Sequence, residues 1–334
     1  MPAIRKRHLG LLLSICLSLS LAGCGSGAYV IEPIPSRQGL SETQVKADPG
    51  WFISDKVAII DVDGIIMNEQ QSGLFRVGEN PVSLFAEKLD KAKTDKHVKA
   101  VILRLNTPGG TVAASDIMYH YLLEFKQETQ KPVLAYMMDV AASGGYYLAC
   151  ACDGIMAQPS TVTGSIGTIL QTVSFEGTMQ KIGVKADAIK SGKMKDMGSP
   201  LHDLQTEERQ LLQNIINQYY ENFLAVVLAG RKNLDREKLL PLADGRVYTG
   251  GQALEAGLID RLGYPTDAIA WAKQMAHLGK AKIVTYHRPY GYKPNFYASA
   301  GENLNPQSLI NIELPRWLRC EGAQFLYLWQ PETN

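Results

Sequence analysis

Short apolar runs alternate along the chain with segments of helical periodicity, and this alternation is what most constrains the fold. Residues 57–60, 100–105 and 133–137 are rich in Val, Ile, Leu and Ala, as expected of buried strands. The spacing of apolar residues predicts a helix near 82–93 and another over 111–128. A strand, a helix and a second strand in succession favour a right-handed βαβ unit. We therefore predict an α/β fold built around a parallel sheet.

The same alternation continues with shorter elements. Residues 143–151 predict a helix of small residues, 154–157 a short strand, and 182–189 a further strand. A long amphipathic helix is expected over 206–229, because its first turn carries two acidic residues and a glycine follows its last apolar residue. The apolar face of this helix needs a partner, within the chain or on another copy of it.

The first residues form a leader that does not belong to the core. Arg5, Lys6 and Arg7 precede an apolar stretch over 9–21, which has the length of a signal peptide and is too short for an ordinary spanning helix. The stretch ends in Leu-Ala-Gly-Cys, which resembles the lipobox of bacterial lipoproteins. We expect cleavage before Cys24 and attachment of lipid to its thiol, although an ordinary cleavable signal with an incidental cysteine stays open.

The lipobox resemblance implies a protein held on a lipid bilayer of the bacterial envelope, facing the periplasm or the cell exterior. Gly25 stands where an aspartate would favour the inner membrane, so both membranes stay open. Removing the leader leaves 31 basic against 33 acidic residues, a balance that does not suggest a nucleic-acid partner. Residues 24–55 mix Gly, Pro, Ser and charge, as expected of a tether.

The cysteines beyond the leader and lipobox do not suggest a disulfide framework or a metal site. Cys150 and Cys152 are too close in a predicted helix to bridge easily, and Cys320 lies far away in the sequence. No group of Cys and His has metal-ligand spacing. We interpret the first two as small buried residues and expect neither metal nor cofactor.

Four polar or glycine-rich stretches lie at the ends of predicted strands or in loops, at residues 106–110, 142–147, 163–167 and 190–196. Ligands of open α/β sheets bind outside the carboxyl ends of the strands, so the loops after the central strands should converge on one crevice. In the first stretch Pro-Gly-Gly bends sharply and exposes backbone N–H groups, as an oxyanion hole requires. By itself this tripeptide is also an ordinary turn.

Ser143 lies between a predicted strand and a predicted helix, where a nucleophile would be exposed in a tight turn. The Gly144 amide would complete an oxyanion hole with that of Gly110. An ordinary N-cap is the competing interpretation of this serine. The hydroxyl needs a base, but the mature chain's histidines lie outside the glycine-rich loops: His97, His120, His202, His277 and His287.

A buried lysine with a lowered pKa can replace histidine as the base. Lys190, Lys193 and Lys195 are the candidates, and their spacing does not choose among them. A solvated basic loop is the alternative interpretation of this cluster.

The four stretches, in this order, resemble those of the signal peptide peptidase A family of serine proteases, as do residues 243–250 and 257–260 further on. The resemblance covers roughly 57–263. It implies that Ser143 is the nucleophile, Lys195 the general base and Ser165 a supporting hydroxyl that orients the lysine amine. It also implies the Clp protease and crotonase type of fold, a parallel-sheet core of repeated ββα units, in a short, single-unit member that forms a homo-oligomeric ring.

On this resemblance the chain divides into a signal peptide (1–23), a tether (24–55), a peptidase domain (56–286) and a tail of unassigned structure (287–334). The implied activity is that of a Ser–Lys endopeptidase acting on cleaved signal peptides and other peptide or protein substrates, with small side chains at the substrate subsites. Two alternatives share the features of the loops: a crotonase-like acyl-CoA enzyme, and a catalytically silent ring that binds extended peptides.

Overall fold

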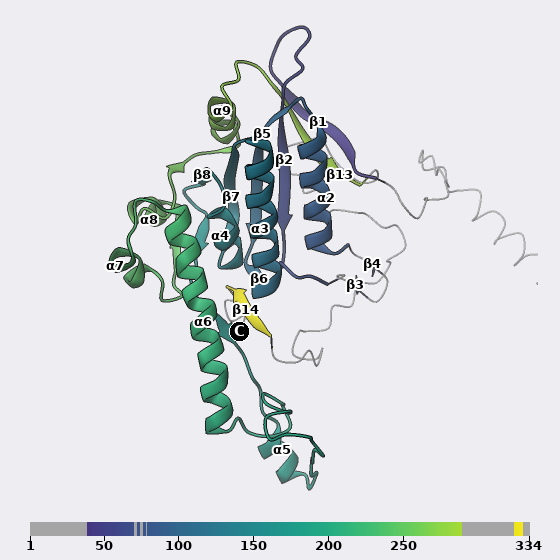
Figure 1. The fold of residues 1–334 in the computed structure, drawn as a ribbon, viewed down its shortest axis with the longest axis vertical. Coiled ribbons are helices and arrows are strands. Elements are labelled where there is room, and N and C mark those ends of the chain that lie inside the picture. The colour runs from purple at the N-terminus through teal and green to yellow at the C-terminus, as the bar shows by residue number, and fades with distance from the viewer. Residues whose placement is uncertain (1–38, 70–71, 74–75, 78, 289–323, 330–334) are drawn as a thin grey trace, which may run out of the picture. The chain divides into compact units, whose positions relative to one another are not determined.

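A computed structural model describes residues 39–69, 72–73, 76–77, 79–288 and 324–329, all of which belong to the compact unit Gly39–Asn334 (Figure 1). The predicted signal peptide, Cys24 and most of the tail lie outside the described residues. Within the described residues, no helix combines the length and the apolar character needed to cross a bilayer.

A mostly parallel sheet forms the centre of the fold. Its order is β1 (Ser41–Ala47), β13 (Lys282–His287), β2 (Lys56–Asp63), β5 (Val98–Thr107), β7 (Val133–Ala142), β8 (Gly154–Ala157) and β12 (Arg261–Leu262). Neighbours from β13 to β12 are parallel, and β1 is antiparallel to β13. The predicted α/β fold with a parallel sheet is confirmed.

Helices cover both faces of this sheet (Figure 1). On one side α2 (Pro81–Thr94) and α3 (Val112–Thr129) pack over Ile60 and Leu103. On the other side α9 (Pro265–Met275) packs over Ile59 and Ile102. Because neighbouring residues of each strand point to opposite faces and both faces are buried, the strands read as continuous apolar runs.

The predicted helices over 82–93, 111–128, 143–151 and 206–229 appear as α2, α3, α4 (Gly144–Ala149) and α6 (Thr206–Gly230). The predicted strand over 182–189 was wrong: the short helix α5 (Glu176–Lys181) ends there and irregular backbone follows. The apolar side chains of this stretch are exposed and meet no neighbouring strand. A β-type composition does not make a strand without one to pair with.

The remaining elements are short. They are the paired strands β3 (Ser72–Gly73) and β4 (Arg76–Val77), strands β6 (Gly109–Thr111), β9 (Val162–Gly164), β10 (Ile169–Leu170), β11 (Val247–Thr249) and β14 (Phe325–Leu328), helices α7 (Arg236–Leu239) and α8 (Gly250–Glu255), and a 3-10 turn at Leu240–Leu242.

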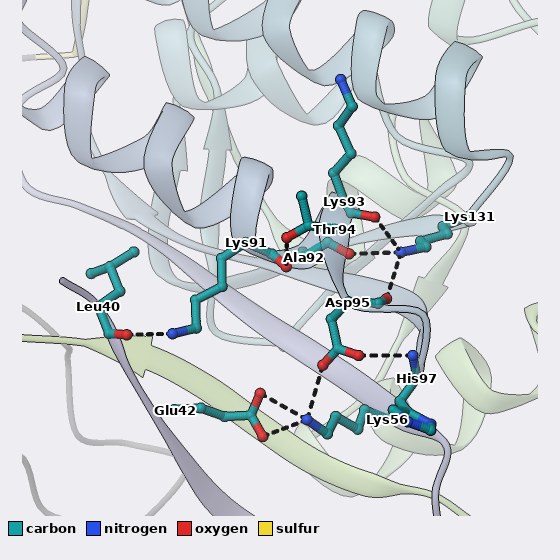
Figure 2. Close-up of polar contacts among 10 residues, drawn as sticks. All are labelled: Leu40, Glu42, Lys56, Lys91, Ala92, Lys93, Thr94, Asp95, His97 and Lys131. Atoms are coloured by element: carbon teal, nitrogen blue, oxygen red, sulfur yellow. Dashed lines mark hydrogen bonds and ion pairs between the residues drawn. The ribbon is translucent and has the colours of Figure 1, made fainter.

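Strand β1 lies within residues 24–55, which the sequence suggested as a tether, so the folded body begins earlier than Lys56. Side chains attach the strand to the body, as Figure 2 shows. The Lys56 amine donates to Glu42 of β1 at 2.7 Å and to Asp95 at 2.9 Å. The Lys91 amine donates to a main-chain carbonyl just before β1. A search for apolar runs misses this strand, because its side chains are mostly polar and its partner strand lies far away in the sequence.

The carboxyl end of α2 is held by one half-buried lysine (Figure 2). The Lys131 amine donates to the main-chain carbonyls of Ala92 at 2.6 Å, Asp95 at 3.0 Å and Lys93 at 3.2 Å. These carbonyls would otherwise lack partners at the helix end. Burial lowers the pKa of Lys131. This lysine is structural and lies at the end of the sheet opposite the carboxyl ends of its strands.

Candidate active site

Ser143 occupies a strained turn between β7 and α4. Its backbone has φ 53° and ψ −113°, a region that L-residues rarely adopt. Main-chain bonds hold it there: its N–H donates to the Gly164 carbonyl at 2.7 Å, and its carbonyl accepts from the Tyr147 N–H at 2.8 Å. The side chain makes no capping bond to α4, so the ordinary N-cap interpretation does not hold. Such a strand-to-helix turn is the conformation that presents a catalytic serine.

The glycine loop after β5 lies directly against this turn. A Cβ built on Gly109, which has φ 99°, would lie 2.7 Å from the amide nitrogen of Gly144. A Cβ on Gly110 would lie 1.8 Å from the Ile66 carbonyl oxygen. Glycine is therefore required at both loop positions for the backbones to approach. The arrangement brings the two predicted oxyanion loops together beside Ser143.

Ser165 is placed by the neighbouring strand. Strands β7 and β9 are parallel, with Ala142 and Gly164 as register partners. Ser143 and Ser165 are the next residues, and both have positive φ, 53° and 51°. The Ser165 N–H donates to the Arg246 carbonyl at 2.8 Å. Both serine side chains are buried, with 1% and 7% exposure.

Residues 243–250 and 257–260 hold in place the elements around these serines. Strand β11 pairs antiparallel with β9, with Val247 opposite Gly164. The Asp260 carboxylate accepts from the Ile155 N–H at 2.8 Å and binds Arg231 at the end of α6. The second of the two stretches therefore ties α6 to β8, and the first holds β9, the strand that ends just before Ser165.

The three candidate lysines differ in their partners. Lys190 pairs with Asp196 at 2.5 Å, and Lys193 pairs with Glu207 at 2.6 Å. Lys195 is exposed, and its amine has no hydrogen bond or ion pair to a described residue. In the described part of a single chain, no hydrogen bond joins Lys195 to Ser143 or Ser165. The structure therefore gathers the serines and the glycine loops but does not add Lys195 to them.

One group of side chains near Lys195 has the composition of a metal site. Asp196, His202 and Glu208 place ligand atoms within 4.8 Å of one another. Each already has protein partners: Asp196 binds Lys190, His202 contacts two main-chain carbonyls, and Glu208 accepts from the Gln205 N–H in a capping box. Ion pairing and helix capping account for the group without a metal.

The structure also brings to the site a segment that sequence reasoning left unassigned. Strand β14 pairs with β6, the strand of the glycine loop, and with β10, which follows Ser165 by four residues. The aromatic and apolar residues over 325–329 are the signal that was present in the sequence. Their partner strands lie far away in the chain, so local sequence does not identify them.

Comparison with known proteins gives a consistent answer. The chain matches the model of peptidase family S49 over residues 125–279, which include Ser143, Ser165 and Lys195. A protein of Enterococcus faecium provisionally named signal peptide peptidase SppA is 37% identical over 231 residues, covering 69% of this chain and 67% of that protein.

Two further relatives bear protease names. A Synechocystis protein provisionally named protease slr0021 is 39% identical over 228 residues, covering 68% of this chain and 77% of that protein. Protease 4 of Haemophilus influenzae is 35% identical over 227 residues, covering 68% of this chain and 36% of that longer protein. The fold is of the Clp protease and crotonase type. The chain therefore belongs to peptidase family S49, the signal peptide peptidase A family, and is a serine peptidase.

Proposed function

We propose that this serine peptidase uses a Ser–Lys dyad in which Ser143 is the nucleophile and Lys195 its general base. The Ser165 hydroxyl accepts a hydrogen bond from the neutral lysine amine and orients it toward Ser143, and the amides of Gly110 and Gly144 bind the oxyanion. The observation that carries the proposal is the strained turn of Ser143 directly beside the two glycine loops.

The chemistry runs in two steps. The Ser143 Oγ attacks a peptide carbonyl while the neutral Lys195 amine takes its proton, and the protonated lysine then gives that proton to the leaving amine as the C–N bond breaks. Water attacks the resulting ester, again with the amine as base, and releases the acid and free Ser143. The preorganised amides act in both steps, because each passes through a tetrahedral oxyanion.

A second copy of the chain offers the simplest way to complete the dyad. Lys195 lies in the segment 171–205, which leaves several apolar side chains exposed: Val173, Phe175, Ile182, Ile189 and Leu201. Large apolar side chains gathered on one exposed segment favour contact with a partner. We propose that this segment packs against a neighbouring copy in a homo-oligomeric ring, and that the packing buries Lys195 beside a serine of that copy. Burial would also lower the lysine's pKa, as a base requires.

The proposed substrates are peptides, including cleaved signal peptides, as the name of the Enterococcus faecium relative suggests. The proposed location is the bacterial envelope, with the mature chain held on a membrane through lipidated Cys24. Both points rest on sequence. Growth with labelled fatty acid would test the second, because Cys24→Ala should abolish incorporation into the protein.

A fluorophosphonate probe tests the nucleophile separately from any choice of substrate. We expect the intact chain to be labelled and Ser143→Ala to remain unlabelled. Lys195→Ala should lower peptide hydrolysis by about 10³-fold or more, whereas Lys193→Ala, in the same segment, should leave it nearly unchanged. Hydrolysis that survives both Ser143→Ala and Lys195→Ala would sink the proposal.

Mixing two inactive variants tests the sharing of a site between copies. Ser143→Ala and Lys195→Ala proteins, dissociated and reassembled together, should regain part of the activity, since some interfaces then combine an intact serine with an intact lysine. If both residues of a dyad come from one chain, the mixture stays inactive.

A further inference from the structure

The loop between β1 and β2, residues 48–55, presents two adjacent aromatic side chains to solvent. Trp51 is 91% exposed and Phe52 is 98% exposed. Phe52 has φ 59°, a left-handed conformation that is uncommon for a residue with a bulky side chain. Figure 1 shows this loop projecting at the end of the sheet away from α5. Two neighbouring rings in water indicate a surface that a partner covers.

The base of the loop is fixed to the sheet. The Asp48 N–H donates to the Ala281 carbonyl at 3.2 Å, and the Asp55 carbonyl accepts from the Lys282 N–H at 2.8 Å. Lys282 and Lys56, the first residues of β13 and β2, are register partners. The loop therefore lies at the amino edge of the parallel sheet, where β13, β2 and β5 begin, whereas the candidate active site lies at the carboxyl edge.

Basic side chains surround the loop at this edge. The Lys280 amine lies 3.1 Å from the position of a Cβ built on Gly50, the residue before Trp51. Five lysines of the amino edge make no ion pair within the described part of the chain: Lys46, Lys96, Lys99, Lys280 and Lys282.

The carboxylates nearby neutralise little of this charge. Asp48 pairs with Lys273 at 2.5 Å, and Asp95 pairs with Lys56 at 2.9 Å (Figure 2). Asp55 is half-buried and has no ion pair to a described residue. The unpaired lysines outnumber it, so the surface around the two rings is positive.

We propose that this loop and the lysines around it form a docking surface for a bilayer with anionic head groups. Aromatic rings suit the boundary between head groups and acyl chains, and lysines at that level bind lipid phosphates. An apolar tip within a rim of unpaired lysines matches the layered chemistry of an anionic lipid surface better than that of a protein partner. The inference depends neither on the Ser–Lys dyad nor on lipid at Cys24.

Docking through the amino edge turns the candidate active site away from the lipid. Strand β7 has ten residues, so at about 3.3 Å per residue it holds Ser143 about 30 Å from the bilayer. Peptides that have left the membrane can reach a site at that height. Strand β1 starts at the carboxyl edge, but a fully extended chain with the length of residues 24–38 reaches about 50 Å. An anchor at Cys24 is therefore compatible with this orientation.

Vesicle binding by the chain without its leader and Cys24 tests the proposal, because neither the leader nor attached lipid then contributes. The compact unit Gly39–Asn334 stays whole in this form. The measurement is cosedimentation with vesicles of phosphatidylcholine and phosphatidylglycerol in equal parts. Trp51→Ser together with Phe52→Ser should weaken binding by about tenfold or more. Tyr264→Ser is the control, since it removes a ring that is 57% exposed beside β12, and it should not change binding.

The charges are tested in the same assay. Lys280→Gln should weaken binding to these vesicles by about threefold or more, and added salt should weaken binding of the parent chain. Lys185→Gln, which removes an exposed lysine from segment 171–205, is the control and should have little effect. Binding that ignores both salt and Lys280 would contradict the proposed anionic surface.

Quenching of tryptophan fluorescence by brominated lipid reports whether the loop itself enters the bilayer. Trp51→Phe keeps an aromatic ring, so it should bind vesicles as the parent does but lose most of the quenching. Unchanged vesicle binding after serine replaces both rings would overturn the proposal. If that replacement instead dissociates an oligomer in sedimentation without lipid, the surface joins copies of the chain and the proposal is wrong.

Peptide hydrolysis separates this inference from the proposed function. The chain with serine at both positions should hydrolyse peptides in solution at the parent rate, because the loop lies at the edge opposite Ser143. A chain that docks as expected but hydrolyses nothing leaves the docking surface standing while the proposed dyad fails.

Discussion

Ser143 and Ser165 each follow one member of a register pair, Ala142 on β7 and Gly164 on β9, and both have φ near +50°: 53° and 51°. Each of these two parallel strands is thus followed by a serine with an uncommon positive φ, at the same level of the sheet. Left-handed backbone at a non-glycine residue is unfavourable and persists only where the surroundings impose it. The bonds from the Ser143 N–H to Gly164 and from the Ser165 N–H to Arg246 impose it here.

The strain at Ser143 gives a stability prediction. Ser143→Gly should raise the free energy of unfolding by about 1–2 kcal/mol relative to Ser143→Ala, because glycine tolerates the backbone conformation and alanine does not. Both variants remove the nucleophile, so the comparison isolates the backbone. Urea unfolding of the two variants measures it. Equal midpoints would show that the turn is not strained.

The hydroxyl of Ser165 should matter for rate rather than for substrate binding. Ser165→Ala keeps the Cβ and the main-chain bond to Arg246 but removes the group proposed to orient the lysine amine. We expect kcat to fall by about 10- to 100-fold with KM nearly constant. Ser160→Ala, at an exposed position before β9, is the control and should keep normal kinetics. A change confined to KM would argue for a role in substrate binding instead.

The Asp260 carboxylate should be important for stability. Arg231, with a side chain only 6% exposed, makes bonds of 2.9 and 2.8 Å to Asp260, which is 36% exposed. Asp260→Asn leaves the buried guanidinium without its charge partner and should lower the free energy of unfolding by about 2 kcal/mol.

The matched control for Asp260 is Glu221→Gln. Glu221 makes the same two-bond pair with Arg236, but both side chains are 52% exposed. Its loss should lower the free energy of unfolding much less than Asp260→Asn does, because solvent screens the exposed pair. Thermal or urea unfolding of the two variants side by side gives the measurement. Equal losses would mean that burial of Arg231 adds nothing.

The segment that carries Lys195 should respond to pH through His202. Both ring nitrogens face main-chain carbonyls, Nδ1 that of Asp203 at 3.0 Å and Nε2 that of Asp196 at 3.1 Å. Only the protonated ring donates from both nitrogens. These two bonds therefore raise the pKa of His202 above its ordinary 6.5, and the bond to Asp203 has the larger effect.

A raised histidine pKa stabilises the folded segment fully below pH 6.5 and progressively less as pH rises through the folded-state value. Hydrogen exchange of residues 196–205 should therefore quicken between mildly acidic and alkaline pH. An NMR titration should place the His202 pKa above 6.5. In His202→Gln the exchange rates should follow only the intrinsic pH dependence of amide exchange. A His202 pKa at or below 6.5 would contradict this account.

Much of the fold could be predicted because strands that are buried on both faces of the sheet appear as apolar runs in the local sequence. Strands β2, β5 and β7 are apolar almost throughout, and the helices between them carry one apolar face. Strand β1 has no such apolar run, since its residues alternate between half-buried and exposed and its partner is Lys282–His287. Pairings across such sequence distances are decided by the assembled sheet.

The candidate site, like the fold, could be predicted only in part. Gly110, Gly144 and Ser143 could be predicted to meet, because parallel strands bring their carboxyl ends to one edge. The place of Lys195 could not, since its segment has exposed apolar side chains and lacks contacts that would fix it beside Ser143 within the described chain. The pairing of β6 with β14 could not be predicted either, because β14 lies more than two hundred residues later in the sequence.

Strand β6 is bonded along both edges, to Ile66 on one side and to β14 on the other. An enzyme that cuts extended chains has to keep a strand edge accessible, and an accessible edge is also where unrelated chains add themselves and begin to aggregate. While β14 is in place, the main-chain groups of that edge make their hydrogen bonds within the protein itself. These few residues therefore also protect the protein from aggregating through this edge.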